Sequence, residues 1–136
     1  MTEFEDDSSD DAPKVFISHH SKDRGAARLL GYQVEADQYG VEAEDNSPKR
    51  PYRGNWKTPM TAKIGDSDVV IVVVGEDTHT RAAVKWELKT AKKLGKPVYA
   101  VKIKGDERVP REVYDAGGKV VDWNMEAIKY EIHYNT

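Results

Sequence analysis

Trp86 and Glu87 stand side by side in a segment with a helical pattern, directly after a polar loop at Gly75 to Thr80. A carboxylate near the start of a helix can stabilise positive charge that develops on a ribose ring, or hold ribose hydroxyls. The residue pattern alone favours a simpler interpretation, in which Glu87 is a solvated helix residue. In that interpretation Trp86 belongs to the core or its boundary.

Two adjacent histidines, His19 and His20, follow a short apolar segment. With Asp23 or Asp45 as further ligands they raise the hypothesis of a metal site. Adjacent histidines usually point in different directions, and the other histidines do not stand at a ligand spacing. We therefore predict two polar loop residues and no metal, with a nucleotide-facing role for one of them as a weaker hypothesis. Ser18 lacks the flanking glycines of a nucleophilic serine elbow.

Five basic residues are candidates for binding phosphate. The best of them lie in the long loop from Asp45 to Asn55, and solvated surface charge is the simpler explanation for each. The five are Arg24, Arg28, Lys49, Arg50 and Arg53.

The elements that must position these residues centre on Asp68 to Gly75, an unbroken apolar run that ends in glycine. A strand that is apolar on both faces must be covered on both, which is typical of a central strand in a parallel sheet. A helical pattern from Arg81 to Leu94 and a strand at Val98 to Ile103 complete a βαβ unit. Its apolar helix positions are Ala83, Val84, Leu88 and Ala91.

Strands and helices alternate along the rest of the chain. Further strands are expected at Lys14 to Ser18, Val41 to Glu44 and Lys119 to Asp122, and further helices at Arg24 to Asp37, Trp56 to Ile64, Val109 to Ala116 and Met125 to Tyr134. The pattern predicts an α/β fold, a three-layer sandwich with a five-stranded parallel sheet in flavodoxin-like order 2-1-3-4-5. Ligands bind such sheets outside the C-terminal ends of the strands. That rim comprises Ser18 to Asp23, Asp45 to Ser47 and Gly75 to Thr80.

The same topology serves phosphoacceptor receivers, which need acidic residues after the first strand, an aspartate ending the third and a lysine ending the fifth. This chain has Ser18-His19-His20, Gly75 and Asp122-Trp123 at those places, which excludes a receiver. It also has no Walker-type glycine loop.

Composition divides the chain into residues 1–12, expected to form an acidic disordered tail, and a single domain over residues 13–136. The chain carries a net charge of −3 and its first twelve residues six acidic side chains, so the domain carries +3. This positive net charge is too small to predict nucleic-acid binding. The chain has no cysteine and no apolar run near the roughly 20 residues of a membrane span. We expect a cytoplasmic protein that binds neither nucleic acid nor membrane.

Five segments, in order and spacing, resemble a TIR (Toll/interleukin receptor) domain, specifically the TIR-like proteins of Thoeris antiphage defence. They lie within residues 14–104 and are Lys14 to His19, Asp45 to Ser47, Ile64 to Thr78, Val84 to Leu88 and Lys93 to Val98. The fourth segment resembles the helix that bears the family's tryptophan and catalytic glutamate. After residue 104 the chain departs from many TIR domains, which affects the expected oligomer contacts more than the active site.

The resemblance implies an enzyme that cleaves NAD at the nicotinamide–ribose bond and releases an ADP-ribose-derived signal. It implies that Glu87 is catalytic, that NAD is the substrate with no further cofactor, and that copies of the protein self-associate to order the loop after the second strand. The implied substrate-binding residues are Ser18, His19, His20, Asp45, Asn46 and Trp86. Because many TIR domains are adaptors, the alternative is a non-catalytic TIR-like protein–protein interaction module.

Overall fold

The computed structural model describes residues 13–34 and 56–134. Its sheet has four parallel strands in the order β1-β2-β3-β4. The strands are β1 (Val15–His19), β2 (Val69–Val74), β3 (Val98–Lys102) and β4 (Lys119–Val121). The α/β class and the parallel sheet are therefore confirmed, and the order agrees with strands 1, 3, 4 and 5 of the predicted sheet. The remaining predicted strand, Val41 to Glu44, lies outside the described residues, so the fifth strand stays a prediction.

Strand β2 lies in the middle of the sheet, between β1 and β3, and all six of its residues are buried. Ile71 pairs with Ile17 of β1 on one side and with Tyr99 of β3 on the other. Since successive side chains of a strand point to opposite faces, this strand contributes to two separate cores. The prediction that the apolar run forms a central strand is confirmed.

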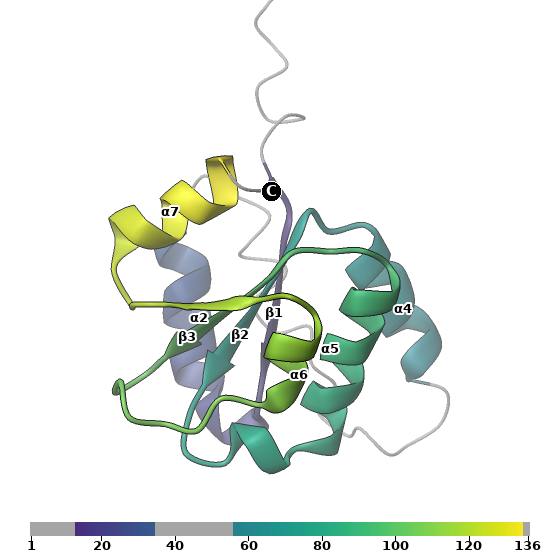
Figure 1. The fold of residues 1–136 in the computed structure, drawn as a ribbon, viewed down its shortest axis with the longest axis horizontal. Helices are drawn as coiled ribbons and strands as arrows, with labels where there is room; N and C mark the ends of the chain where they lie inside the picture. The colour runs from purple at the N-terminus through teal and green to yellow at the C-terminus, as the bar shows by residue number, and fades with distance from the viewer. Residues whose placement is uncertain (1–12, 35–55, 135–136) are drawn as a thin grey trace, which may run out of the picture.

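Helices cover both faces of the sheet, as Figure 1 shows. On one face, α2 (Arg24–Gln33) and α7 (Met125–Tyr134) pack over a core that includes Val69, Ile71 and Val73. On the other face, α4 (Lys57–Gly65), α5 (Ala82–Lys93) and α6 (Arg111–Asp115) pack over a core that includes the alternate residues. These alternate residues of β2 are Val70, Val72 and Val74. The three layers follow from the need to cover both faces of β2.

The helix boundaries follow local stop signals. Helix α5 ends just before Gly95, whose φ of +71° lies in the left-handed region that glycine tolerates. Helix α6 is shorter than predicted because Pro110 is its N-cap and Gly117, with φ of +75°, follows its end. Ala27 and Leu30 of α2 are buried, as is Val34 directly after the helix, whereas Leu29 is half exposed.

Two short 3-10 helices follow the first two strands of the described sheet: η1 (Ser21–Asp23) after β1, and η2 (Thr78–Thr80) after β2. They place the exit loops of both strands at the C-terminal edge of the sheet. In the part of the chain described here, no helix combines the length and apolar character that crossing a membrane requires.

Gly118, just before β4, allows a close approach of three chain segments. A Cβ atom there would lie 2.5 Å from the carbonyl oxygen of Val98 and 3.0 Å from that of Val113. We expect Gly118→Ala to lower the free energy of unfolding by about 1–3 kcal/mol, because rigid backbone would have to move. Gly25→Ala in α2 is the matched control, since a Cβ there meets nothing within 4 Å. It should be neutral or stabilising by roughly 0.5–1 kcal/mol. Urea unfolding measures both, and equal losses would contradict the packing argument.

Candidate functional site

The side chains of Ser18 and Glu87 meet between the C-terminal end of β1 and helix α5. The Ser18 hydroxyl donates a hydrogen bond of 2.6 Å to Oε1 of Glu87. Both residues have no exposed surface, although they stand 69 positions apart in the chain. Ser18 points toward α5 because it shares the strand face of Phe16, which belongs to the α4–α5–α6 core. The fold therefore brings together two of the predicted site residues.

The interpretation of Glu87 as a solvated helix residue is wrong, because its exposed fraction is 0%. Position 87 follows Ala83 by four residues and Val84 by three, and Leu88 and Ala91 continue the same buried face. The helical spacing alone therefore indicated burial of position 87, and only the charge of the residue argued against it. Carboxylates are almost never fully buried without polar partners, and the hydroxyl of Ser18 is such a partner for Glu87.

His19 lies in β1 rather than in a loop, so the prediction that it is a polar loop residue is wrong. The strand extends one residue further than expected, and His19 pairs with Val73 of β2. The residue is 2% exposed, and its Nδ1 lies 2.9 Å from the carbonyl oxygen of His20. By the alternation of the strand it faces the side opposite to Ser18. Direct contact between His19 and a ligand bound at Glu87 stays a prediction.

His20 lies in the exit loop as predicted, at the N-cap position of η1, and is partly exposed. Its Nδ1 accepts a hydrogen bond of 3.0 Å from the backbone N–H of Lys22. Burial lowers the pKa of the imidazole, and the positive charge of Arg81 lowers it further. Within residues 13–34 and 56–134, no group of three or more His, Asp or Glu side chains is arranged to hold a metal ion.

Trp86 lies at the boundary of the α4–α5–α6 core, as the residue pattern predicted. Its ring meets the ring of Trp56 edge to face, with centroids 5.1 Å apart and an interplanar angle of 71°. The Nζ atom of Lys57 lies 5.8 Å from both ring centroids, a cation–π distance. The tryptophan therefore packs α5 against the start of α4.

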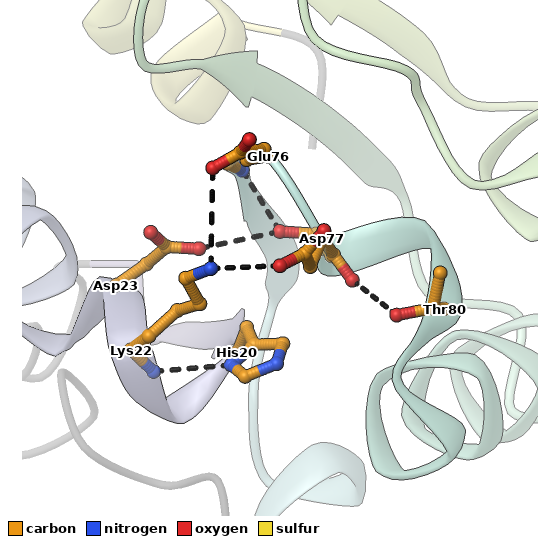
Figure 2. A network of polar contacts seen from close by, with 8 residues as sticks. His20, Lys22, Asp23, Glu76, Asp77 and Thr80 are labelled. Carbon is orange, nitrogen blue, oxygen red and sulfur yellow. Dashed lines mark hydrogen bonds and ion pairs between the residues drawn. The ribbon is translucent and has the colours of Figure 1, made fainter.

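The exit loops of β1 and β2 are joined by an ion pair (Figure 2). Lys22 donates a hydrogen bond of 2.7 Å to Asp77 and lies 4.0 Å from Glu76. The hydrogen bond raises the pKa of Lys22 and lowers that of Asp77. In the segment after β2, the hydroxyl of Thr78 accepts a hydrogen bond of 2.8 Å from the backbone N–H of Gly75. These contacts hold together the exit loops of β1 and β2. Helix α5, which carries Glu87, begins directly after the second of these loops.

Gly75 leaves room at the end of β2 for the Asp23 carboxylate, which packs directly against it. A Cβ atom at this position would lie 2.6 Å from the carboxyl carbon of Asp23. The Oδ2 atom of Asp23 also lies 3.4 Å from the hydroxyl of Thr78. Asp23 stands at the N-cap position of α2, but its side chain makes no capping hydrogen bond to that helix. Its carboxylate lies at the rim instead.

A cavity of about 440 Å³ opens at this rim, beside the C-terminal ends of the central strands. Its lining includes neither Ser18 nor Glu87, so it is a feature separate from the buried hydrogen bond. The lining residues are Lys22, Asp23, Gly75, Glu76, Ile103, Lys104, Asp106, Glu107 and Arg108. The sequence did not indicate the segment 103–108 as part of a site, because it has no recognisable motif.

Several predicted residues lie outside the described part of the chain. They are Asp45 and Asn46, which were expected near the ribose, and the basic residues Lys49, Arg50 and Arg53. Their roles stay predictions.

The family model for the TIR-like domain of the Thoeris protein ThsB matches residues 16–108. The chain belongs to this family. The matched range contains both partners of the buried hydrogen bond, Ser18 and Glu87, and the whole lining of the cavity. A search among curated proteins found no match. Membership in this family confirms the resemblance and indicates that the TIR-like domain belongs to antiphage defence.

The causes of the pKa shift of His20 in the TIR-like domain can be tested by histidine NMR titration. We expect His20 to titrate below 6.5, and Arg81→Gln to raise its pKa without restoring the ordinary value, because burial remains. The folded state favours neutral His20, so its contribution to stability is complete above pH 6.5 and falls as the pH drops through the folded pKa. Arg111→Gln, which changes an exposed side chain at the start of α6, is the control that should leave the pKa of His20 unchanged. An unchanged His20 pKa in Arg81→Gln would contradict the assignment.

Proposed function

We propose that this TIR-like protein is an NAD-processing enzyme of antiphage defence that acts in the cytoplasm. The reaction is of the NAD glycohydrolase or ADP-ribosyl cyclase type, and Glu87 is the catalytic carboxylate. One observation carries the proposal: a fully buried glutamate, fixed by Ser18, lies beside the C-terminal end of β1. Open α/β sheets bind their ligands at that edge.

The proposed mechanism begins with loss of nicotinamide through an oxocarbenium-like state on the ribose. Glu87 stabilises the positive charge that develops there, and water or an ADP-ribose hydroxyl then attacks the same carbon. A carboxylate interacts more strongly with a nearby charge when protein rather than water surrounds it. Ser18 is a positioning residue, because its 2.6 Å hydrogen bond fixes the orientation of the carboxylate.

A non-catalytic interaction module is the alternative function. That hypothesis expects a filled cleft and Glu87 at the surface in an ion pair. The cavity at the rim does not reach Glu87, but the complete burial of the side chain does not meet the expectation of a surface ion pair. Burying a carboxylate costs free energy, and an adaptor surface needs no such group. The burial of Glu87 thus favours the enzyme.

NAD turnover by purified protein and by Glu87→Gln tests the proposal. We expect the substitution to reduce the rate on the order of 10²–10³-fold, because it removes the charge that stabilises the transition state. Ser18→Ala should reduce the rate on the order of tenfold, because the carboxylate stays but loses its orientation. Glu126→Gln, exposed on α7, is the control with an unchanged rate. Equal turnover by wild type and Glu87→Gln would remove Glu87 from the mechanism, whereas no turnover by either protein would support the interaction module.

We also propose that self-association raises the activity, as membership in the TIR-like family suggests. NAD turnover per molecule should then rise with protein concentration, in parallel with the oligomer fraction measured by sedimentation velocity. The physical reason is positioning, since a neighbouring copy can complete a site without supplying new chemistry. A constant, high rate from a strictly monomeric protein would contradict the assembly proposal and leave the assignment of Glu87 intact.

A further inference from the structure

The cavity at the rim lies on the face of the sheet opposite to Glu87. Gly75 and Ile103 in its lining continue the alternation of Ile71, Val73 and Val101, which face α2 and α7. Ile103 also packs against the core on that face. The hydrogen bond between Ser18 and Glu87 lies on the α5 face. The cavity is therefore a site separate from the hydrogen bond between Ser18 and Glu87.

The loop from Ile103 to Arg108 forms one wall of the cavity, and the Glu107 carboxylate in it folds back onto the backbone of the same loop. Glu107 accepts hydrogen bonds of 2.7 Å from the backbone N–H of Lys104 and 2.9 Å from that of Gly105. Gly105 makes the turn possible, because its φ is +106°. Burial acts to raise the pKa of Glu107, but the backbone hydrogen bonds outweigh it and lower the pKa. The Glu107 carboxylate is thus hydrogen-bonded to the backbone of its own loop.

The same wall presents two cations to the cavity, Lys104 and Arg108. Within the described ranges neither makes a salt bridge, in contrast to Lys22 on the facing loop, which is paired with Asp77. A lysine and an arginine in the lining of one cavity suit a phosphate group, since a guanidinium can donate two parallel hydrogen bonds to phosphate oxygens.

The opposite wall offers hydrogen-bond acceptors. Asp23, held against Gly75 at the end of β2, lines the cavity together with Glu76, and Asp106 adds a carboxylate from the loop that carries Lys104 and Arg108. Carboxylate oxygens accept hydrogen bonds from hydroxyl groups, and they repel phosphate. A ligand that satisfies both walls carries phosphate at one end and hydroxyls at the other. A metal ion does not fit as well, because these carboxylates form no ligand cluster in the described residues.

We propose that this cavity binds a small phosphorylated sugar, with the phosphate on Lys104 and Arg108 and the sugar hydroxyls on Asp23. Its volume of about 440 Å³ suits such a ligand. Its place beside the C-terminal ends of β1, β2 and β3 is where parallel α/β sheets bind phosphorylated ligands.

Calorimetric titrations of the full chain with ribose 5-phosphate, inorganic phosphate and ribose test the proposal. We expect ribose 5-phosphate to bind most tightly, and Lys104→Gln and Arg108→Gln each to weaken its binding on the order of tenfold. Asp23→Asn should reduce the advantage of ribose 5-phosphate over inorganic phosphate. Arg111→Gln, whose exposed side chain pairs with Asp115 outside the cavity, should leave binding unchanged. Circular dichroism of each variant establishes that it is folded.

Two outcomes would overturn the proposal. An equal loss of affinity in Arg111→Gln and Arg108→Gln would show a general electrostatic attraction, and equal affinities for phosphate and ribose 5-phosphate would show that the sugar makes no contact. Glu87→Gln separates the two sites. Unchanged ribose 5-phosphate binding in that variant supports a site distinct from Glu87, and lost binding would show that the ligand occupies the proposed NAD site instead.

Discussion

The double-sided burial of β2 is the constraint on which the rest of this structure depends. Six consecutive apolar residues have no face that can be left to water, so helices must cover the strand above and below. Burying a valine or isoleucine side chain contributes about 1.5–3 kcal/mol, so this strand contributes strongly to the stability of the fold. Helices α2 and α7 on one face and α4, α5 and α6 on the other are the response.

The parallel arrangement brings the ends of the central strands to one edge, and the functional features gather there. Because strand residues alternate, this edge has two sides with different chemistry. On the α5 side Ser18 holds the Glu87 carboxylate in a dry environment. On the α2–α7 side an open cavity lined with charged residues lies between exit loops. The ion pair of Lys22 and Asp77 ties the two loops that both sides share.

Glu87 shows how function and stability compete in this TIR-like domain. Its position on α5 is one that an apolar residue would occupy at lower cost, as Val84 and Leu88 do on the same face. Ser18 on β1 supplies a hydrogen bond that offsets part of the cost of burying the carboxylate. We interpret this arrangement as stability given up for a preorganised carboxylate, which accords with the proposed enzymatic role.

The sequence by itself determined the local features: the central strand, helix α5, the glycine that ends it, and the membership in the TIR-like family. These follow from short-range periodicity and stop signals, which neighbouring residues encode. The helical spacing placed position 87 on the buried face, but only the tertiary structure decided that a charged residue is buried there, that Ser18 is its partner, and that His19 belongs to the strand. The physical reason is that burial of a polar side chain depends on a partner 69 positions away, and no local pattern specifies that partner. The cavity beside Arg108 also could not be predicted from the sequence, because the loops that follow three different strands form it together.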